Sequence, residues 1–216
     1  MPSRTYDQFC GLARTLDVVG DRWNLLIVRE LLTGPKRNVD LRAGLAGIAT
    51  NLLGERLREL EAAGVVSRRR LPPPAASTVY ELTERGEGLR PAVLELARWG
   101  RPLLGERGAG EEFRPSWLLL SLAASFEPGA ARGAKESYEL RIDEHLLSVA
   151  VEDGRIAVAD GPSPDPAARV VEADADTFLA WGTGRIDAAA ALAAGLRADG
   201  GRRTLRRLRA LFPPSG

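Results

Sequence analysis

The sequence predicts two domains, a mainly α-helical one over residues 1–104 and an α+β one with an antiparallel sheet over residues 116–216. The first observation is the length of 216 residues, which is more than one average domain needs. The second is the stretch 105–115, GERGAGEEFRP, which lacks apolar periodicity and has the composition of a linker. The third is charge: residues 1–104 carry 16 basic and 12 acidic side chains, whereas residues 105–216 carry 14 and 17.

Composition excludes several classes of protein. Hydrophobic residues make up 44% and charged residues 27%, as in a soluble globular chain. The longest apolar run, 117–124, is far shorter than the ~20 residues of a membrane helix, and the N-terminus lacks the apolar segment of a secretion signal. One cysteine and one histidine argue against an internal disulfide and a zinc site. We therefore expect a cytoplasmic protein with no membrane partner, metal or cofactor.

Four short helices are expected at the start of the first domain. Apolar spacing places them at residues 9–16, 22–32, 38–45 and 50–63. The second is apolar on most faces, which indicates a buried central helix, and Asn38 or Asp40 can cap the third. In the fourth, Leu53, Leu57 and Leu60 have the i, i+4, i+7 spacing of a buried helix face.

A hairpin and a long helix complete the first domain. Residues 65–71 and 78–82 are expected to pair as strands across the turn PPPAAS. A helix should then run from Thr83 or Glu84 to about Leu104, kinked or divided at Pro91. Two short helices joined by a tight turn and followed by a basic hairpin form a winged helix-turn-helix, in which residues 50–63 are the recognition helix.

The second domain is expected to combine helices with a sheet. Helices are predicted at 115–126, 174–181, 187–194 and 204–212. Short alternating segments predict strands at 138–142, 146–151, 155–158 and 169–173, with a last short one at 196–198. Because turns such as Asp153-Gly154 separate the strands, the pattern indicates an antiparallel meander.

The predicted recognition helix presents a polar face opposite its three leucines. That face carries Asn51, Glu55 and Arg58. An asparagine can pair with adenine, an arginine can pair with guanine or phosphate, and a glycine lets the backbone approach DNA at a helix cost of ~1 kcal/mol. The candidates on this helix are Thr50, Asn51, Gly54, Arg56 and Arg58. An ordinary amphipathic surface helix would show the same pattern, so that alternative stays open.

Two further basic clusters flank this helix in sequence. Alternation along a strand sends at least one of Arg68, Arg69 and Arg70 towards solvent or phosphate. A second cluster before the third helix is placed to contact phosphate and consists of Lys36, Arg37 and Asn38. A solvated charge run is the alternative. Binding is favoured because the clusters fall on the three elements that a winged helix presents to DNA.

Several spaced motifs within residues 8–104 resemble the HxlR-type winged-helix regulators, relatives of the MarR group. They are a cysteine near the start, GDRW-x-LLI-x-REL, GI-x3-LL-x2-RLRELE-x2-GV and YELT-x2-G. The resemblance implies a homodimeric transcription factor on a near-palindromic operator, with the dimer built by the N-terminal segment and the helix after the wing. Two departures, Ala49 where the family often has serine and Asn51 where it often has a basic residue, leave the operator sequence open.

Cys10 has two interpretations. In some relatives the N-terminal cysteine senses oxidants or electrophiles, which requires an accessible thiol with a lowered pKa. Arg14 stands one helical turn later, but Phe9 and Leu12 suggest apolar surroundings. The alternative is a small buried hydrophobic residue.

The second half resembles sterol-carrier-protein-like domains in the segments YELRID, LLSVAVEDGRIAV and VVEADADTFLAWGTGRIDAAAALAAGLRADG. The resemblance implies a curved antiparallel sheet covered by helices, which often encloses an apolar tunnel. The candidate pocket residues for a small hydrophobic effector are Trp117, Phe126, Phe178 and Trp181. Their alternative role is that of ordinary core aromatics.

The sequence as a whole predicts a DNA-binding transcriptional regulator. Enzymatic motifs such as GxSxG, HExxH and GxxxxGK[ST] are absent, so we expect no catalytic residues. One alternative is a carrier of lipids or hydrophobic metabolites that uses the winged helix to bind another protein. A third possibility is an enzyme acting inside a cavity of the second domain.

Overall fold

The chain forms two compact units in a computed structural model that describes residues 5–74, 76–105, 107–108 and 110–214. The units are Met1–Val93 and Leu94–Gly216. Their boundary lies within helix α6 (Arg90–Gly100), ahead of the stretch 105–115 that the sequence suggested as a linker.

Four helices build the body of the first unit. They are α1 (Gly11–Val19), α2 (Asn24–Leu31), α3 (Asn38–Gly44) and α4 (Thr50–Ala62). Leu53, Leu57 and Leu60 of α4 are almost completely buried, as their spacing predicts. The helix α2 contributes Ile27, Val28 and Leu31 to the same interior, which explains why its sequence is apolar on several faces.

The starts of α3 and α4 differ from the predicted caps. Arg37, not Asn38, precedes the first residue of α3, and the Asp40 carboxylate accepts a hydrogen bond of 3.1 Å from the Arg37 backbone N–H. Asp40 therefore satisfies a free donor from inside the first turn. Ala49 precedes α4, and the Thr50 hydroxyl accepts a hydrogen bond from Arg42.

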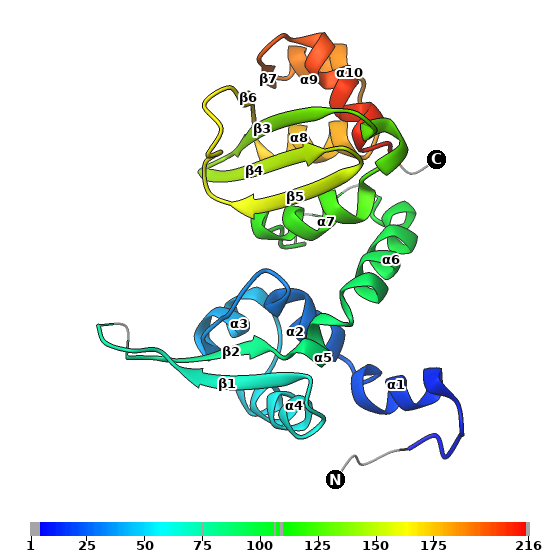
Figure 1. The fold of residues 1–216 in the computed structure, drawn as a ribbon, viewed down its shortest axis with the longest axis vertical. Helices are drawn as coiled ribbons and strands as arrows, with labels where there is room; N and C mark the ends of the chain where they lie inside the picture. The colour runs from blue at the N-terminus through cyan, green and yellow to red at the C-terminus, as the bar shows by residue number, and fades with distance from the viewer. Residues whose placement is uncertain (1–4, 75, 106, 109, 215–216) are drawn as a thin grey trace. The chain divides into compact units, whose positions relative to one another are not determined.

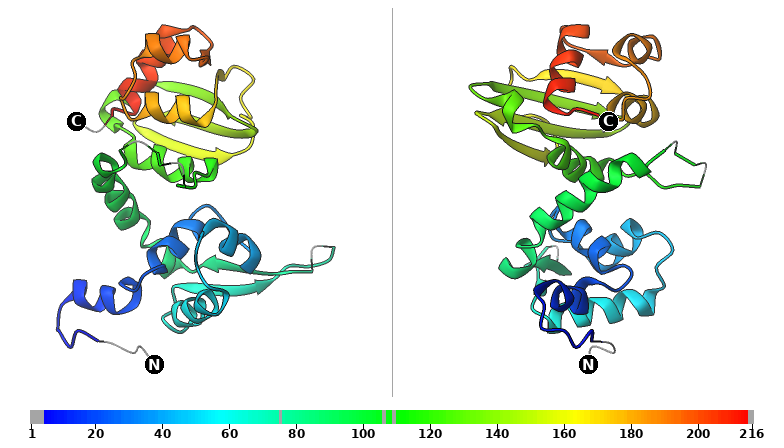
Figure 2. Two further views of the ribbon diagram at one scale, coloured as in Figure 1. Left: turned by 180° about the vertical axis from the view of Figure 1, so that it is seen from behind. Right: turned by 90° about the vertical axis from the view of Figure 1, so that its right-hand side faces the viewer.

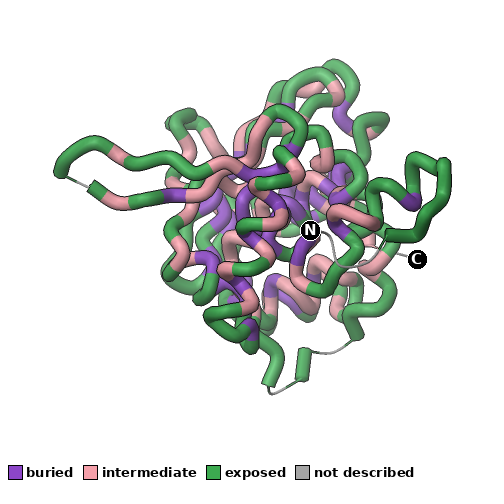
Figure 3. The backbone as a smooth tube through the Cα atoms, turned by 90° about the horizontal axis from the view of Figure 1, so that it is seen from below, coloured by how far each residue is buried: buried purple, intermediate pink, exposed green. Residues whose placement is uncertain are grey.

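The wing is an antiparallel hairpin of β1 (Val66–Arg70) and β2 (Thr78–Leu82), with Val66 opposite Leu82. Lys36 adds a short third edge, because its N–H donates to the Tyr80 carbonyl at 2.9 Å and its carbonyl accepts from the Tyr80 N–H at 2.8 Å. The hairpin extends beyond the helices of its unit (Figure 1). Much of it is coloured as exposed in Figure 3.

The chain leaves the wing through a tight junction. The Thr83 hydroxyl donates to the Gly64 carbonyl at 2.6 Å and accepts from the Gly86 N–H at 3.1 Å. These bonds fix the end of β2 and the start of α5 (Glu84–Glu87) against the segment that follows α4. The long helix expected after the wing is divided: α5 ends at Glu87 and α6 begins at Arg90. Pro91 is the second residue of α6, where its missing N–H removes no helical bond.

The second unit contains a five-stranded sheet with helices. Its helical elements are η1 (Arg101–Leu103), η2 (Pro115–Trp117), α7 (Leu118–Ser125), η3 (Pro128–Ala131), α8 (Ala175–Gly182), α9 (Ala188–Ala193) and α10 (Arg202–Leu211). Its strands are β3 (Lys135–Ile142), β4 (His145–Glu152), β5 (Arg155–Asp160), β6 (Arg169–Ala173) and β7 (Arg197–Ala198). Helices α8, α9 and α10 cover one face of the sheet in Figures 1 and 2.

The prediction of an antiparallel sheet is wrong at one pairing. The strand order is β5-β4-β3-β6-β7, and β6 runs parallel to β3, so the sheet is mixed. Residues 161–168 carry the chain from the end of β5 past β4 and β3 to the start of β6, which pairs with β3 rather than with β5. A strand's own alternation of side chains does not encode which neighbour it pairs with or in which direction.

The core of the second unit lies between the sheet and its helices. Tyr138, Leu140 and Ile142 on β3 are fully or almost fully buried, and Phe178 and Trp181 of α8 belong to the same cluster. Among the described residues, none of the helices combines the length and the apolar character needed to cross a bilayer.

We expect Gly86→Ala to lower the free energy of unfolding by roughly 1–3 kcal/mol, as overpacking of a filled site does. A Cβ at this position would lie 2.1 Å from the Val65 carbonyl oxygen, so the junction would have to open. The shift is measured from the midpoint of urea unfolding. Gly54→Ala is the control, because a Cβ at Gly54 meets no atom within 4 Å. Equal stabilities of the Gly86→Ala variant and the original chain would contradict this account.

Candidate nucleic-acid interface

The solvent face of α4 carries the predicted polar residues. Asn51, Glu55 and Arg58 are exposed, on the side of the helix opposite its buried leucines, and Thr50 is exposed at its first turn. The Arg58 side chain folds back along the helix, because its Nε donates to the Gly54 carbonyl at 3.1 Å. The face therefore combines hydrogen-bonding groups of both polarities with one cation.

Gly54 has no internal reason to be a glycine. Apart from its chain neighbours and the surrounding helix backbone, no described atom lies within 4 Å of the place that a Cβ would occupy, so close packing inside the protein does not explain the residue. A glycine inside a helix costs about 1 kcal/mol relative to alanine. The residue leaves the α4 backbone uncovered beside the polar face, which permits a close approach by a binding partner.

The helix α3 adds a cation that the sequence analysis did not select. Arg42 is exposed, and its Nη1 donates to the Thr50 hydroxyl at 3.2 Å, which joins α3 to the start of α4. Arg37 and Asn38 lie at the start of α3, where Arg37 pairs with Asp40 at 3.2 Å. Only the turn between the two helices brings Arg42 to Thr50, and the sequence carries no periodic signal for that contact.

The three wing arginines are not equivalent. Arg69 is bound to both carboxylate oxygens of Glu81, at 3.1 and 2.9 Å, and hydrogen bonding from Arg69 lowers the pKa of Glu81. The charge of Arg69 is thus balanced within the hairpin. Arg68 lies 3.7 Å from Glu61 of α4. Arg70 is exposed and makes no ion pair with the residues that the structure describes.

Arg56 is used inside the protein. Its side chain is only 15% exposed and pairs with Asp21 at 2.6 Å and with Glu59 at 2.5 Å. Asp21 lies between α1 and α2, so the arginine ties α4 to the start of the domain. The open basic surface therefore consists of exposed side chains of α3, α4 and the wing, together with the Gly54 position of α4. We call it the α4–wing surface and define it by Arg42, Asn51, Gly54, Arg58 and Arg70.

Cys10 is exposed, which contradicts its interpretation as a buried hydrophobic residue. It stands directly before α1, and the neighbouring backbone N–H groups of Ala13 and Leu12 lower the pKa of its thiol. Arg14, one turn further along, is within 3.5 Å of Asp17.

The four aromatic residues proposed for a pocket lie within the second unit. Phe178 and Trp181 are neighbours on α8 with ring centroids 5.9 Å apart, and Phe126 packs against Phe212 at 6.0 Å. These three are buried in the core, whereas Trp117 is half-buried at the end of η2. Two hollows of the unit are lined largely by charged side chains and include none of the four.

Comparison with known proteins identifies the first unit. The HxlR-like helix-turn-helix family matches residues 18–107. The uncharacterized HTH-type transcriptional regulator YkvN of Bacillus subtilis is 40% identical over 91 residues, which are 42% of this chain and 77% of that protein. The HTH-type transcriptional regulator YodB of the same organism is 38% identical over 82 residues, or 38% of this chain and 73% of that protein.

A solved structure also matches. The reduced form of YodB from B. subtilis is 32% identical and covers 45% of this chain and 97% of that one, with a TM-score of 0.40. Both sequence relatives are named as transcriptional regulators, not as enzymes. The chain therefore belongs to the HxlR-like helix-turn-helix family and is a transcriptional regulator whose first unit carries the DNA-binding domain.

Proposed function

We propose that the protein binds a near-palindromic operator as a homodimer, with α4 in the major groove and the wing on the neighbouring backbone. The observation that carries the proposal is the α4–wing surface, which joins an exposed polar helix face, an uncovered helix backbone and a free wing arginine. A groove-inserted recognition helix presents such a face to base edges, while basic groups around it hold phosphates.

The side chains of α4 suggest which bases they read. Asn51 can bond bidentately to adenine and Arg58 to guanine, and the Glu55 carboxylate can accept from the cytosine N4 amino group. A carboxylate beside phosphate is repelled, so Glu55 favours a position facing the bases. Arg42 and Arg70, on either side of the helix in the chain, are suited to phosphate contacts that fix its register.

The double variant Arg58→Ala, Arg70→Ala should weaken operator binding without changing the urea midpoint. Neither arginine forms an ion pair with a described residue, so neither should be needed for folding. Loss of the phosphate contact proposed for Arg70 should make the slope of log K against log salt shallower by about 1, and loss of the base contact proposed for Arg58 should lower the affinity further. Fluorescence anisotropy at several salt concentrations measures both effects. Arg85→Ala, an exposed arginine of α5, is the matched control. Affinity and slope equal to those of the control would reject this placement.

Gly54→Ala should separate stability from binding. The new methyl group meets nothing in the free protein, so helix propensity predicts a gain of up to about 1 kcal/mol in the free energy of unfolding. The same group would project where DNA is expected to approach, so operator affinity should fall. A thermal melt and an anisotropy titration test the two halves. A more stable variant with unchanged affinity would show that α4 stays farther from DNA than proposed.

The dimer is supported by exposed apolar side chains on two elements. Around α1 these are Tyr6, Phe9 and Leu12, and Leu12 is 68% exposed. On and after α6 they include Trp99, which is 74% exposed, and Leu103. Concentrations of large apolar side chains on a surface commonly mark protein interfaces. A two-fold dimer would place two recognition helices about one helical turn of DNA apart, ~34 Å.

A charge placed in either apolar cluster should dissociate the dimer. We expect Leu12→Glu and Trp99→Glu each to shift the mass from dimer to monomer at micromolar concentration, because a buried carboxylate without a partner is costly. Light scattering gives the mass. Val39→Glu is the control, since Val39 is equally open but lies on α3. A monomeric original chain, or dimeric glutamate variants, would contradict the proposed interface.

Cys10 is proposed as a redox-sensitive residue of the same regulator, because its thiol is exposed and its pKa is lowered. Alkylation by iodoacetamide should therefore have its pH midpoint below that of the same protein unfolded in urea. Oxidant should alter operator affinity of the original chain and leave Cys10→Ser unaffected. Equal midpoints in the folded and unfolded protein, or equal responses of the two chains, would count against a sensor.

We also propose that a small hydrophobic effector binds the second unit near Trp117, Phe126, Phe178 and Trp181. Binding requires the three buried rings to separate, so the effector would have to favour an opened form. A coupled effector changes operator affinity roughly 5–150-fold. Screening apolar metabolites against the intact chain by anisotropy tests this, and no response would leave the rings with a packing role alone. The alternative of a hydrophobic carrier is less favoured, because such a carrier has no use for the α4–wing surface.

A further inference from the structure

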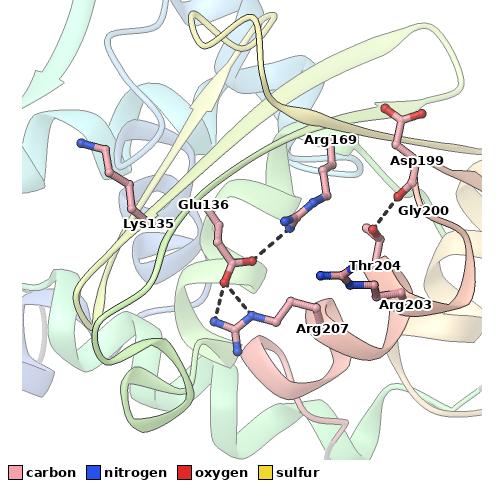
Figure 4. A pocket seen from close by; sticks show the side chains of 8 residues that line it. All are labelled: Lys135, Glu136, Arg169, Asp199, Gly200, Arg203, Thr204 and Arg207. Carbon is pink, nitrogen blue, oxygen red and sulfur yellow. Dashed lines mark hydrogen bonds and ion pairs between the residues drawn. The ribbon is translucent and has the colours of Figure 1, made fainter.

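A hollow of about 650 Å³ opens in the second unit, where β3, β6 and α10 begin. Its lining includes Glu136, Arg169, Gly200, Arg203, Thr204 and Arg207 (Figure 4). Two of its four basic lining residues, Arg203 and Arg207, come from the last part of the chain, where residues 197–216 hold six arginines and one acidic residue. Neither the packing of the fold nor the proposed DNA and effector sites explain why so much positive charge gathers here.

The Glu136 carboxylate accepts hydrogen bonds from several side chains at the base of the hollow. Glu136 accepts from Arg207 Nε at 2.7 Å and from Arg169 Nη1 at 3.2 Å, and the Tyr138 hydroxyl also donates to it. Burial opposes the charge of Glu136, but hydrogen bonds from Arg207, Tyr138 and Arg169 outweigh it and lower the pKa. Arg207 is further held by the Ala130 carbonyl at 2.8 Å. The floor is therefore ionised and rigidly bonded near neutral pH.

The positive charge around this carboxylate is in excess. Three guanidinium groups, those of Arg169, Arg203 and Arg207, line the hollow with the single carboxylate of Glu136 between them. The other acidic lining residue, Asp199, directs its carboxylate away from Glu136 in Figure 4 and accepts from the Val170 N–H at 2.9 Å. Together with Lys135, the lining carries four cationic side chains against two carboxylates, a net charge of +2.

The donors that remain free point to a ligand. Arg203 forms no ion pair with the described part of the chain, and Figure 4 shows its guanidinium extending from α10 into the hollow. Arg169 engages Glu136 and Tyr138 through Nη1 and lies over the Tyr138 ring at 5.6 Å, while its Nε and Nη2 make no hydrogen bond with the described residues. The first turn of the ten-residue α10 also lines the hollow, and a helix N-terminus carries partial positive charge.

We propose that this hollow binds a small organic anion, a carboxylate or phosphate monoester, between Arg203 and Arg169. Two planar guanidinium forks suit the oxygens of either group, and such charge-assisted pairs are strong and directional. The volume is within the range of small-molecule sites, ~300–1,000 Å³, and exceeds what a bare inorganic ion needs. The binding is independent of the proposed function; only an effect of the anion on operator affinity would rest on it.

Calorimetric titration of the full chain with citrate and, separately, with glycerol phosphate tests the site at constant ionic strength. We expect saturable one-site binding of at least one anion, weakened about tenfold or more in Arg203→Ala, as loss of a charged hydrogen-bonding partner predicts. The relative affinities distinguish carboxylate from phosphate. Arg206→Ala is the matched control, because Arg206 is exposed on the same helix but does not line the hollow. Urea unfolding checks that both variants are folded.

Three results would overturn the inference. They are absence of saturable binding of both anions, equal weakening by the two variants, and equal affinities of Arg203→Ala and the original chain.

An operator titration without anion separates this site from the DNA-binding surface. Unchanged operator affinity in Arg203→Ala supports a separate anion site. A loss of operator affinity without loss of anion binding would assign Arg203 to the DNA backbone instead. Neither titration of small anions bears on whether the α4–wing surface binds DNA.

Discussion

The geometry of the DNA-binding unit depends on the close approach of the Gly86 backbone to the Val65 carbonyl. The approach is possible only without a side chain at residue 86. The Thr83 hydroxyl stabilises it, because it donates to the Gly64 carbonyl and accepts from the Gly86 N–H. The same few atoms join the segment between α4 and β1 to the residue after β2 and to the start of α5. The direction in which the hairpin leaves the unit is consequently fixed relative to the recognition helix.

Local patterns were sufficient to predict most elements of the fold. The leucines of α4 identify its buried face because helical periodicity is a property of the segment itself, and the hairpin strands follow from alternation and the proline turn. The parallel pairing of β6 with β3 was missed because it joins residues about 30 positions apart, such as Tyr138 and Arg169. Alternation shows which residues face the core, but it contains nothing about strand order.

The candidate site was predictable as a set of elements and less so as a set of residues. Asn51 and Arg58 lie on the expected face of α4, whereas Arg56 turns inward to Asp21 and Arg69 is held by Glu81. An arginine has the same appearance in a sequence whether its charge is balanced by a distant carboxylate or left open. Arg42 was overlooked for the converse reason, because its proximity to Thr50 arises only when α3 and α4 pack together.

The crossover from β5 to β6 also has a consequence for the order of folding. Strands β3, β4 and β5 are joined by short turns, so they can pair soon after the chain collapses. The segment that follows β5 must then cross the sheet before β6 can pair with the open edge of β3. The strand β7 can pair with β6 only after that step. Because β6 gains its pairing contacts only after the crossover has closed over the β3–β4–β5 sheet, the second unit should reach its native state by late addition of β6, β7 and the helix α10 that follows them. The basic hollow beside α10 should accordingly be assembled among the last features of the second unit.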